Sequence, residues 1–396
     1  MRFFIRGLLL SGLFTWTVAF APLHRGETRS SPTVPPLRRS IRSANSNDES
    51  ITEGCRLKDC VCLVTGASRG IGKGIAVELG KQGAIVYVTG TSSTKSVEDS
   101  AKTSAPYVTT QASGGPGTIE ETASEVTAAG GQGIAVYCNH AVDTDVEKLM
   151  NLVQAQHGRL DILINNVFRL PEGGPAQLNK KFWEQGPEVW DTLLTVGCRS
   201  HYVASYYAMP LLFQSQKQRP AHLPRPMIGM ISSFGGNGYT FNLPYGVAKA
   251  AVDRMAKDMA LELADEDMCV VSFYPGLVNT ERTQVSVENG DWEKFVSLPL
   301  DNSETPNFTG KAIVAVSTDP DNKKKSGSVQ VVAELAEEYG FTDVSGRQPP
   351  SIRSLRFLLH SYAFSDEMRQ KIKPEQIPNW KIPFWVMAQG APPSQG

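Results

Sequence analysis

Tyr245 and Lys249 stand four residues apart in the sequence YGVAK. In a helix this spacing places both side chains on one face. A free tyrosine has a pKa of about 10 and is a poor base at neutral pH. A neighbouring ammonium group stabilises the phenolate and so lowers the pKa of the tyrosine. The pair therefore predicts a general acid/base, Tyr245, whose pKa is lowered by Lys249.

A serine precedes this pair by twelve residues, at Ser233, directly after the apolar run 227–231. Its hydroxyl can polarise a carbonyl group or hold an alkoxide while a hydride is transferred. The adjacent Ser232 is the less favoured candidate. Ser233, Tyr245 and Lys249 are therefore our candidate catalytic residues.

A glycine-rich string, TGASRGIG at residues 65–72, follows an apolar run and opens an amphipathic stretch. In a strand-turn-helix unit such a string permits a tight turn, close approach of a diphosphate and close packing of helix on strand. The unpaired N–H groups of the helix start then face the phosphates. We expect this loop to bind a nicotinamide dinucleotide through the residues Gly66, Ser68, Arg69, Gly70, Ile71 and Gly72.

The choice between NAD and NADP depends on the end of the second predicted strand, where an acidic residue would favour NAD. Here the sequence is VTGTSSTK at residues 88–95, with hydroxyl groups and a lysine and no acid. Arg69 can add a charge-assisted contact to a 2′-phosphate. We therefore expect NADP (NADPH) rather than NAD, with Thr91 near the adenosine ribose.

From Lys58 onward, short apolar β-branched runs alternate with amphipathic stretches, which predicts a parallel sheet built from βαβ units. We expect an α/β chain with a single doubly wound Rossmann fold over residues 56–345, in which helices cover both faces of a seven-stranded parallel sheet. The predicted strands are 61–64, 84–89, 133–138, 160–165, 227–231, 269–274 and 329–332. The predicted helices are 71–81, 118–129, 143–156, 188–213, 245–263 and 309–317. Residues 91–117 are expected to form an exposed loop.

In order and spacing, these motifs resemble the short-chain dehydrogenases/reductases over residues 58 to about 345. The resemblance implies an oxidoreductase that interconverts a small-molecule carbonyl and an alcohol with NAD(P), Tyr245 being the general acid/base. It further implies that Lys249 binds ribose and that Ser233 orients the substrate. The remaining cofactor contacts that it implies are Asn139, Asn165, Pro275, Gly276, Val278 and Thr280.

Further strings look like the subgroup of this family called SDR family member 1, which implies an NADPH-linked carbonyl reductase associated with the endoplasmic reticulum. These strings are residues 179–184, 190–191, 196–202, 242–246 and 339–341, with Gly346-Arg347.

Three positions depart from the family pattern. Val167-Phe168 replaces the usual Ala-Gly after the fourth strand, and Asn139 replaces an adenine-binding Asp, although an amide oxygen can still accept the adenine amino proton. Gly197 stands where most of the family has a catalytic Asn that holds a relay water. The subgroup shares this glycine. Gly197 therefore keeps open a second hypothesis, a non-catalytic NADP(H)-binding redox sensor or scaffold. An epimerase or dehydratase is not favoured, because no larger substrate domain is evident.

The first 55 residues are expected to be a cleavable presequence outside the fold. A basic start, a short apolar run at 7–18 and small residues predict a signal peptide, and the Arg-, Ser- and Pro-rich stretch to Ser50 has transit-peptide composition. The motif Ala19-Phe20-Ala21-Pro22 resembles the bipartite presequence of algae with red-lineage secondary plastids. We expect a plastid location; a plain signal for the endoplasmic reticulum is the alternative.

The net charge, the cysteines and the C-terminal extension indicate which kinds of partner the chain can have. The net charge of −1 excludes the basic excess that a nucleic-acid partner requires. The six cysteines are expected to be free, mostly buried thiols, since disulfides are uncommon in long chains of this kind. The aromatic, proline-broken extension at 346–396 could pack on the core, pair subunits of a homo-oligomer or lie on a membrane surface.

Overall fold

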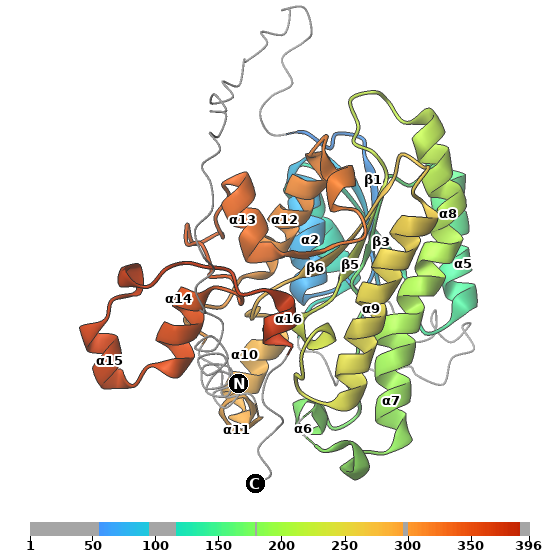
Figure 1. Cartoon of the computed structure of the whole chain (residues 1–396). Helices are drawn as coiled ribbons and strands as arrows, with labels where there is room; N and C mark the ends of the chain where they lie inside the picture. The colour runs from blue at the N-terminus through green and yellow to red at the C-terminus, as the bar shows by residue number, and fades with distance from the viewer. Residues whose placement is uncertain (1–54, 95–115, 179, 296–299, 389–396) are drawn as a thin grey trace, which may run out of the picture.

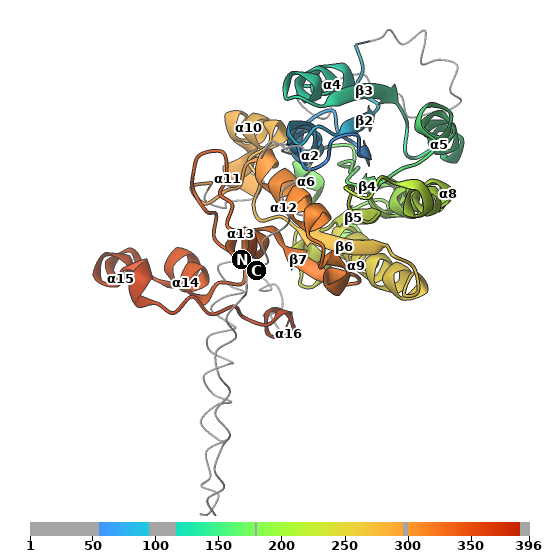
Figure 2. The same cartoon turned by 90° about the horizontal axis from the view of Figure 1, so that it is seen from above.

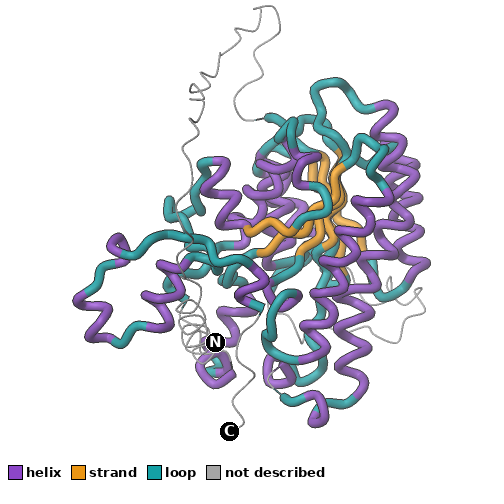
Figure 3. Tube along the Cα trace, in the orientation of Figure 1, coloured by secondary structure: helices purple, strands orange, loops and turns teal. Residues whose placement is uncertain are grey.

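A computed structural model of the chain describes residues 55–94, 116–178, 180–295 and 300–388. Within them a parallel sheet of seven strands has the order β3-β2-β1-β4-β5-β6-β7. Figure 3 shows the strands in orange among the purple helices. The strands are β1 (Val61–Val64), β2 (Ile85–Gly90), β3 (Gln132–Tyr137), β4 (Ile162–Asn165), β5 (Met227–Ile231), β6 (Cys269–Tyr274) and β7 (Val329–Val331). The predicted Rossmann fold is confirmed. Its strand order reverses between β1 and β4, which is where such sheets bind ligands.

Helices cover both faces of the sheet, as Figure 2 shows from above. One face carries α2 (Gly70–Lys81), α4 (Ile119–Ala128) and α12 (Pro306–Thr318). The other carries α5 (Asp143–His157), α8 (Ser200–Gln218) and α9 (Leu243–Glu262). The helices that follow β1 and β2 lie on the first face and those that follow β3, β4 and β5 on the second, since the direction of the connections along the sheet reverses after β3.

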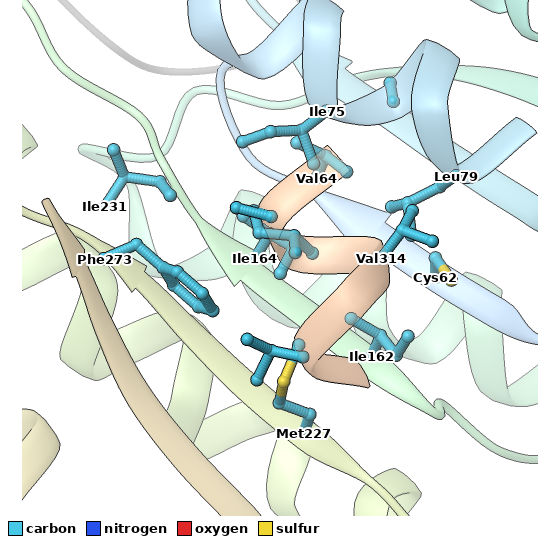
Figure 4. Close-up of a cluster of buried hydrophobic side chains, with 14 of the residues drawn as sticks. Cys62, Val64, Ile75, Leu79, Ile162, Ile164, Met227, Ile231, Phe273 and Val314 are labelled. Atoms are coloured by element: carbon cyan, nitrogen blue, oxygen red, sulfur yellow. The ribbon is translucent and has the colours of Figure 1, made fainter. Parts of the chain in front are cut away.

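The central strands are buried on both faces, which explains why they read as unbroken apolar runs. Figure 4 shows Ile162 and Ile164 of β4 beneath Val314 of α12. Each such side chain contributes roughly 1.5–3 kcal/mol by leaving water. The helix pair α2 and α12 packs closely because Gly74 has no side chain: a Cβ there would lie 2.2 Å from the Pro306 carbonyl carbon.

The prediction of one regular helix over 188–213 is wrong. The structure has α7 (Pro187–Leu194), a π-helical segment (Thr195–Arg199) and then α8. Such π segments often lie at functional sites, and this one contains Gly197.

Sequence patterns also missed several short helices, namely α6 (Pro175–Leu178), α10 (Glu281–Glu288), α11 (Asp291–Phe295), α13 (Val332–Tyr339), α14 (Leu355–Leu358), α15 (Asp366–Lys371) and α16 (Phe384–Met387).

The C-terminal extension leaves the body at α14 and α15 and returns to it at α16 (Figure 1). The Phe384 ring packs edge-on against Tyr274 of β6, with 5.7 Å between the ring centroids. The Asn237 amide donates a hydrogen bond of 2.9 Å to the Phe384 carbonyl oxygen. At α16 the extension therefore packs on the core, directly behind the segment that carries Ser233. None of the helices in the described ranges is both long enough and apolar enough to cross a bilayer.

The predictions for the presequence, the loop at 91–117 and the cysteines remain. The presequence and most of the predicted loop at 91–117 lie outside the described residues. The six cysteines are free, and all but Cys55 are buried, as expected. Cys60 and Cys62 point to the same face of β1, with their sulfur atoms 3.7 Å apart.

Candidate active site

A cavity of about 380 Å³ opens at the carboxyl ends of the strands. Its walls come from the glycine-rich loop, the ends of β2, β4 and β5, the first turns of α9 and the loop after β6. All but one of the residues predicted for the site line this cavity: Gly66, Ser68, Arg69, Gly70, Ile71, Gly72, Thr91, Asn139, Ser233, Tyr245, Lys249, Pro275, Gly276, Val278 and Thr280.

The exception is Asn165. It is fully buried in β4, and its amide donates a 3.0 Å hydrogen bond to the Ser205 hydroxyl of α8. The next residue, Asn166, lines the cavity instead. Its amide donates to the carbonyl oxygens of Thr65 and Gly66, at 2.8 Å and 3.0 Å. Asn166 thus fixes the glycine-rich loop against the end of β4.

Two glycines of this loop are required by its geometry. Gly66 has φ of +65°, and a Cβ there would lie 2.7 Å from the Val167 Cα. A Cβ on Gly72 would lie 2.4 Å from the Asn166 amide nitrogen. The loop therefore lies close against the loop after β4, and the first N–H groups of α2 are left at the cavity.

Just after β2, hydroxyl groups face the cavity, and the guanidinium of Arg69 reaches them from the glycine-rich loop. The Arg69 guanidinium donates to the Ser92 hydroxyl at 2.9 Å and to the Gly117 carbonyl oxygen at 2.8 Å. Ser92 and Thr91 both line the cavity, and Ser92 was not among the predicted residues. After the neighbouring strand β3, the Asn139 side-chain oxygen accepts from the Ala141 N–H at 3.1 Å.

The three catalytic candidates meet at one end of the cavity. The Ser233 hydroxyl lies 2.8 Å from the Tyr245 hydroxyl. Asn242 caps the start of α9 by accepting the Tyr245 N–H at 2.9 Å, which fixes where the tyrosine enters the helix. One turn on, the Lys249 ammonium donates to the Ile231 carbonyl oxygen at 3.1 Å. Ser232 instead donates to the Lys249 carbonyl oxygen, so Ser233 is the serine beside the phenol.

Comparison of the amino-acid sequence with known proteins identifies the family. The family model described as short chain dehydrogenase matches residues 103–291. The mouse (Mus musculus) dehydrogenase/reductase SDR family member 1 is 36% identical over 338 residues, covering 84% of this chain and 96% of that protein. The human (Homo sapiens) protein of the same name is 36% identical over 337 residues, covering 83% and 96%. The chain belongs to the short-chain dehydrogenase/reductase family. It is an NAD(P)-dependent oxidoreductase similar to SDR family member 1.

A solved structure supports the fold alone. A short-chain type dehydrogenase/reductase from Mycobacterium marinum matches with a TM-score of 0.54 and 20% identity, covering 69% of this chain and 94% of that one. The seven-stranded sheet of this short-chain dehydrogenase/reductase is thus of the type found in its family.

Burial governs the ionisation of the catalytic candidates in this short-chain dehydrogenase/reductase. It raises the pKa of the Tyr245 phenol, and the hydrogen bond with Ser233 offsets only part of that rise. It lowers the pKa of Lys249 to about 8, against the opposing charge of Asp253. The prediction of a lowered pKa is therefore wrong for the net direction: the Tyr245 pKa is raised overall, because burial is the largest influence on the phenol and a stabilising charge can act only against that rise. The raised pKa favours the neutral phenol of Tyr245.

Two departures from the family pattern prove to be one feature. A Cβ on Gly197 would lie 3.3 Å from the Phe168 ring, so this ring takes the space beside the glycine. The ring centroid of Phe168 is 5.4 Å from the Lys249 ammonium and 6.0 Å from the Tyr245 ring, which it meets edge-on. A cation this close to an aromatic face is stabilised by it. The Phe168 ring thus fills the space beside Gly197, where most of the family has an Asn side chain, and contacts the Lys249 ammonium from there.

Sequence reasoning missed two carboxyl groups, the half-buried Asp253 and the buried Glu304. Asp253 lies one turn after Lys249 and accepts hydrogen bonds from the hydroxyls of Ser272, at 2.7 Å, and Tyr274. Its i, i+4 spacing from Lys249 could have suggested it. Glu304 accepts the Gly276 N–H at 2.9 Å, and burial raises the pKa of Glu304 to about 8. Glu304 thereby holds the loop after β6, and no local sequence signal marks it.

Proposed function

We propose that this protein is an NADP(H)-dependent carbonyl reductase, with Tyr245 as the general acid/base. The observation that carries the proposal is the 2.8 Å contact between the hydroxyls of Ser233 and Tyr245, inside a cavity that also holds the glycine-rich loop. The walls beside Tyr245 are apolar and include Phe168, Leu170 and Val196. These walls favour a small carbonyl compound with an apolar body.

The described residues fit a nicotinamide dinucleotide. The start of α2 offers N–H groups to a diphosphate, and Arg69 with Ser92 and Thr91 offers a site for a 2′-phosphate at the end of β2. Lys249 would hold the ribose next to the nicotinamide, and the loop from Pro275 to Thr280 would border the ring. When bound, the dinucleotide supplies the hydride for reduction of the carbonyl carbon. The absence of an acidic residue from the chain segment 88–95, which ends β2, supports NADP over NAD.

The proton for reduction comes from Tyr245. Its O–H bond breaks as the proton passes to the carbonyl oxygen, which becomes the hydroxyl of the alcohol. Ser233 donates a hydrogen bond to the same oxygen and stabilises the charge that develops there. The Lys249 ammonium stabilises the phenolate left on Tyr245. The reverse sequence oxidises an alcohol.

The test is a turnover assay with both cofactors. Purified protein is mixed with NADPH or NADH and a panel of apolar ketones and aldehydes, and the nicotinamide absorbance is followed. We expect NADPH to be consumed with at least one substrate and to be preferred over NADH. Preference for NADH would reject the NADP assignment. NADPH binding without consumption across the panel would favour the second hypothesis, a non-catalytic NADP(H) sensor or scaffold, for which Gly197 is the supporting observation.

We further propose that residues 1–55 direct the protein to a plastid. The support is sequence alone: a basic and apolar start, the motif at Ala19 to Pro22, and an acid-poor stretch after it.

A further inference from the structure

An anionic side chain of the protein itself already lies at the start of α2. The Gly70 N–H, at the first residue of this helix, donates a 2.8 Å hydrogen bond to the Glu281 carboxylate. Glu281 is the first residue of α10 and belongs to a segment that reaches the cavity from beyond β6. The unpaired N–H groups and dipole of a helix start attract anions. Glu281 therefore occupies a position suited to a phosphate oxygen.

Two arginines lie near this carboxylate. Arg69 and Arg282 both line the cavity, and the Arg282 Nε is buried with no hydrogen-bond partner among the described residues. Burial and the charge of Arg69 together lower the pKa of Arg282 to about 10, while the charge of Glu281 acts in the opposite direction. The charge of Glu281 thus acts on both guanidinium groups. A buried cation without a full partner is costly, so this place favours an anion of higher charge.

We propose that the Glu281 carboxylate is an internal substitute for the cofactor diphosphate, and that Arg282 is an additional diphosphate-binding residue. In the free protein Glu281 occupies the start of α2. When the diphosphate binds, Glu281 withdraws and Arg282 pairs with the phosphates, while the Arg69 guanidinium stays beside Ser92 at the end of β2. Glu281 therefore weakens cofactor binding and Arg282 strengthens it. The inference rests on the proposed function, since it assigns these residues to the same dinucleotide.

This exchange is linked to the nicotinamide end of the cavity through Thr280. Thr280 directly precedes Glu281 and caps α10, its hydroxyl accepting the Thr283 N–H at 3.2 Å. Thr280 also lines the cavity, so the exchange takes place one residue from the loop that borders the nicotinamide.

The test measures binding to cofactor-free protein, without turnover. Isothermal titration with inorganic pyrophosphate and with NADPH is carried out on the parent, E281Q and R282M. E288Q is the matched control, because Glu288 is an exposed carboxylate at the other end of α10. Loss of a charge-assisted contact is worth roughly a tenfold change in affinity. We expect E281Q to bind both probes about tenfold more tightly, R282M about tenfold more weakly, and E288Q like the parent.

The outcomes separate this inference from the proposed function. If E281Q and E288Q bind pyrophosphate equally, Glu281 is not a substitute for the diphosphate; if R282M binds like the parent, Arg282 is not a ligand. If the parent binds pyrophosphate but not NADPH, and E281Q binds pyrophosphate more tightly, the anion site stands and the cofactor assignment fails. E281A, which leaves no acceptor, must tighten binding at least as much as E281Q. R282Q replaces R282M if thermal unfolding shows that R282M is not folded.

Discussion

Replacing Phe168 by leucine tests whether its ring holds the Lys249 ammonium in its charged form. Lys249 is buried, and burial alone drives it toward the neutral amine. The charge of Asp253 favours the charged form from a distance, and the Phe168 ring centroid at 5.4 Å and the Ile231 carbonyl oxygen at 3.1 Å are direct contacts that also favour it. Leucine keeps an apolar side chain beside Gly197 but removes the aromatic face. The Phe168→Leu variant should therefore have a lower Lys249 pKa.

The size and sign of the effect follow from the structure. A desolvated contact between a cation and an aromatic face is worth about 1–2 kcal/mol, and one pKa unit corresponds to about 1.36 kcal/mol. The pKa of Lys249, about 8 in the parent, should fall by about one unit in the variant. The ammonium is needed to stabilise the phenolate, so the rate of reduction is lost as pH rises through this pKa. Tyr245 does not contribute, because its raised pKa keeps it neutral over this range.

The assay is the pH dependence of kcat/KM for NADPH-dependent reduction, which reports groups of the free enzyme. The alkaline limb should move from near pH 8 to about one unit lower in Phe168→Leu. Phe241→Leu is the control, because the Phe241 ring also meets Tyr245 edge-on, at 5.1 Å, and lacks a comparable contact with Lys249. An unmoved alkaline limb in Phe168→Leu, or an equal shift in Phe241→Leu, would refute this role of the ring.

Three further predictions concern the cofactor, the extension and the presequence. Arg69→Leu should lower the ratio of kcat/KM for NADPH over NADH by roughly tenfold or more, because a charge-assisted contact to the 2′-phosphate is lost; an unchanged ratio would place that phosphate elsewhere. Phe384→Ala should lower the melting temperature and reduce kcat severalfold, since α16 packs behind the Ser233 segment, whereas Trp385→Ala, at an exposed side chain, should change neither; equal effects of the two would contradict that support. Residues 1–55 fused to a fluorescent protein should reach the plastid in an alga with secondary plastids, and Phe20→Ala should arrest the fusion earlier; labelling of the endoplasmic reticulum by both would favour the plain signal peptide.

Much of the sheet could be predicted because burial on both faces leaves a direct mark in the sequence. Runs such as Val61–Val64 and Cys269–Tyr274 are uniformly apolar or small, and the structure places strands at those residues. The last predicted strand ends one residue early, at Val331, because Val332 begins α13. Short helices such as α10 carry too few residues for a clear periodic pattern, and tertiary packing decides their form.

The site was predictable where the chemistry depends on local spacing, as for Tyr245 and Lys249 on one helix. Contacts between distant segments were not predictable. Nothing local indicates that Phe168 packs beside Gly197, since the two meet only when the loop after β4 closes against the π-helical segment. The pKa direction of Tyr245 was missed for the same reason, because the depth of burial is a property of the whole fold.

The most direct test of the central claim is the Tyr245→Phe variant, measured with the carbonyl compound that the parent reduces best. Phenylalanine keeps the buried ring but has no proton to donate. NADPH affinity is measured by fluorescence and turnover by nicotinamide absorbance on the same preparation. We predict near-complete loss of turnover with an NADPH affinity close to that of the parent. Substantial residual turnover would show that another group donates the proton, and the assignment of Tyr245 would be wrong.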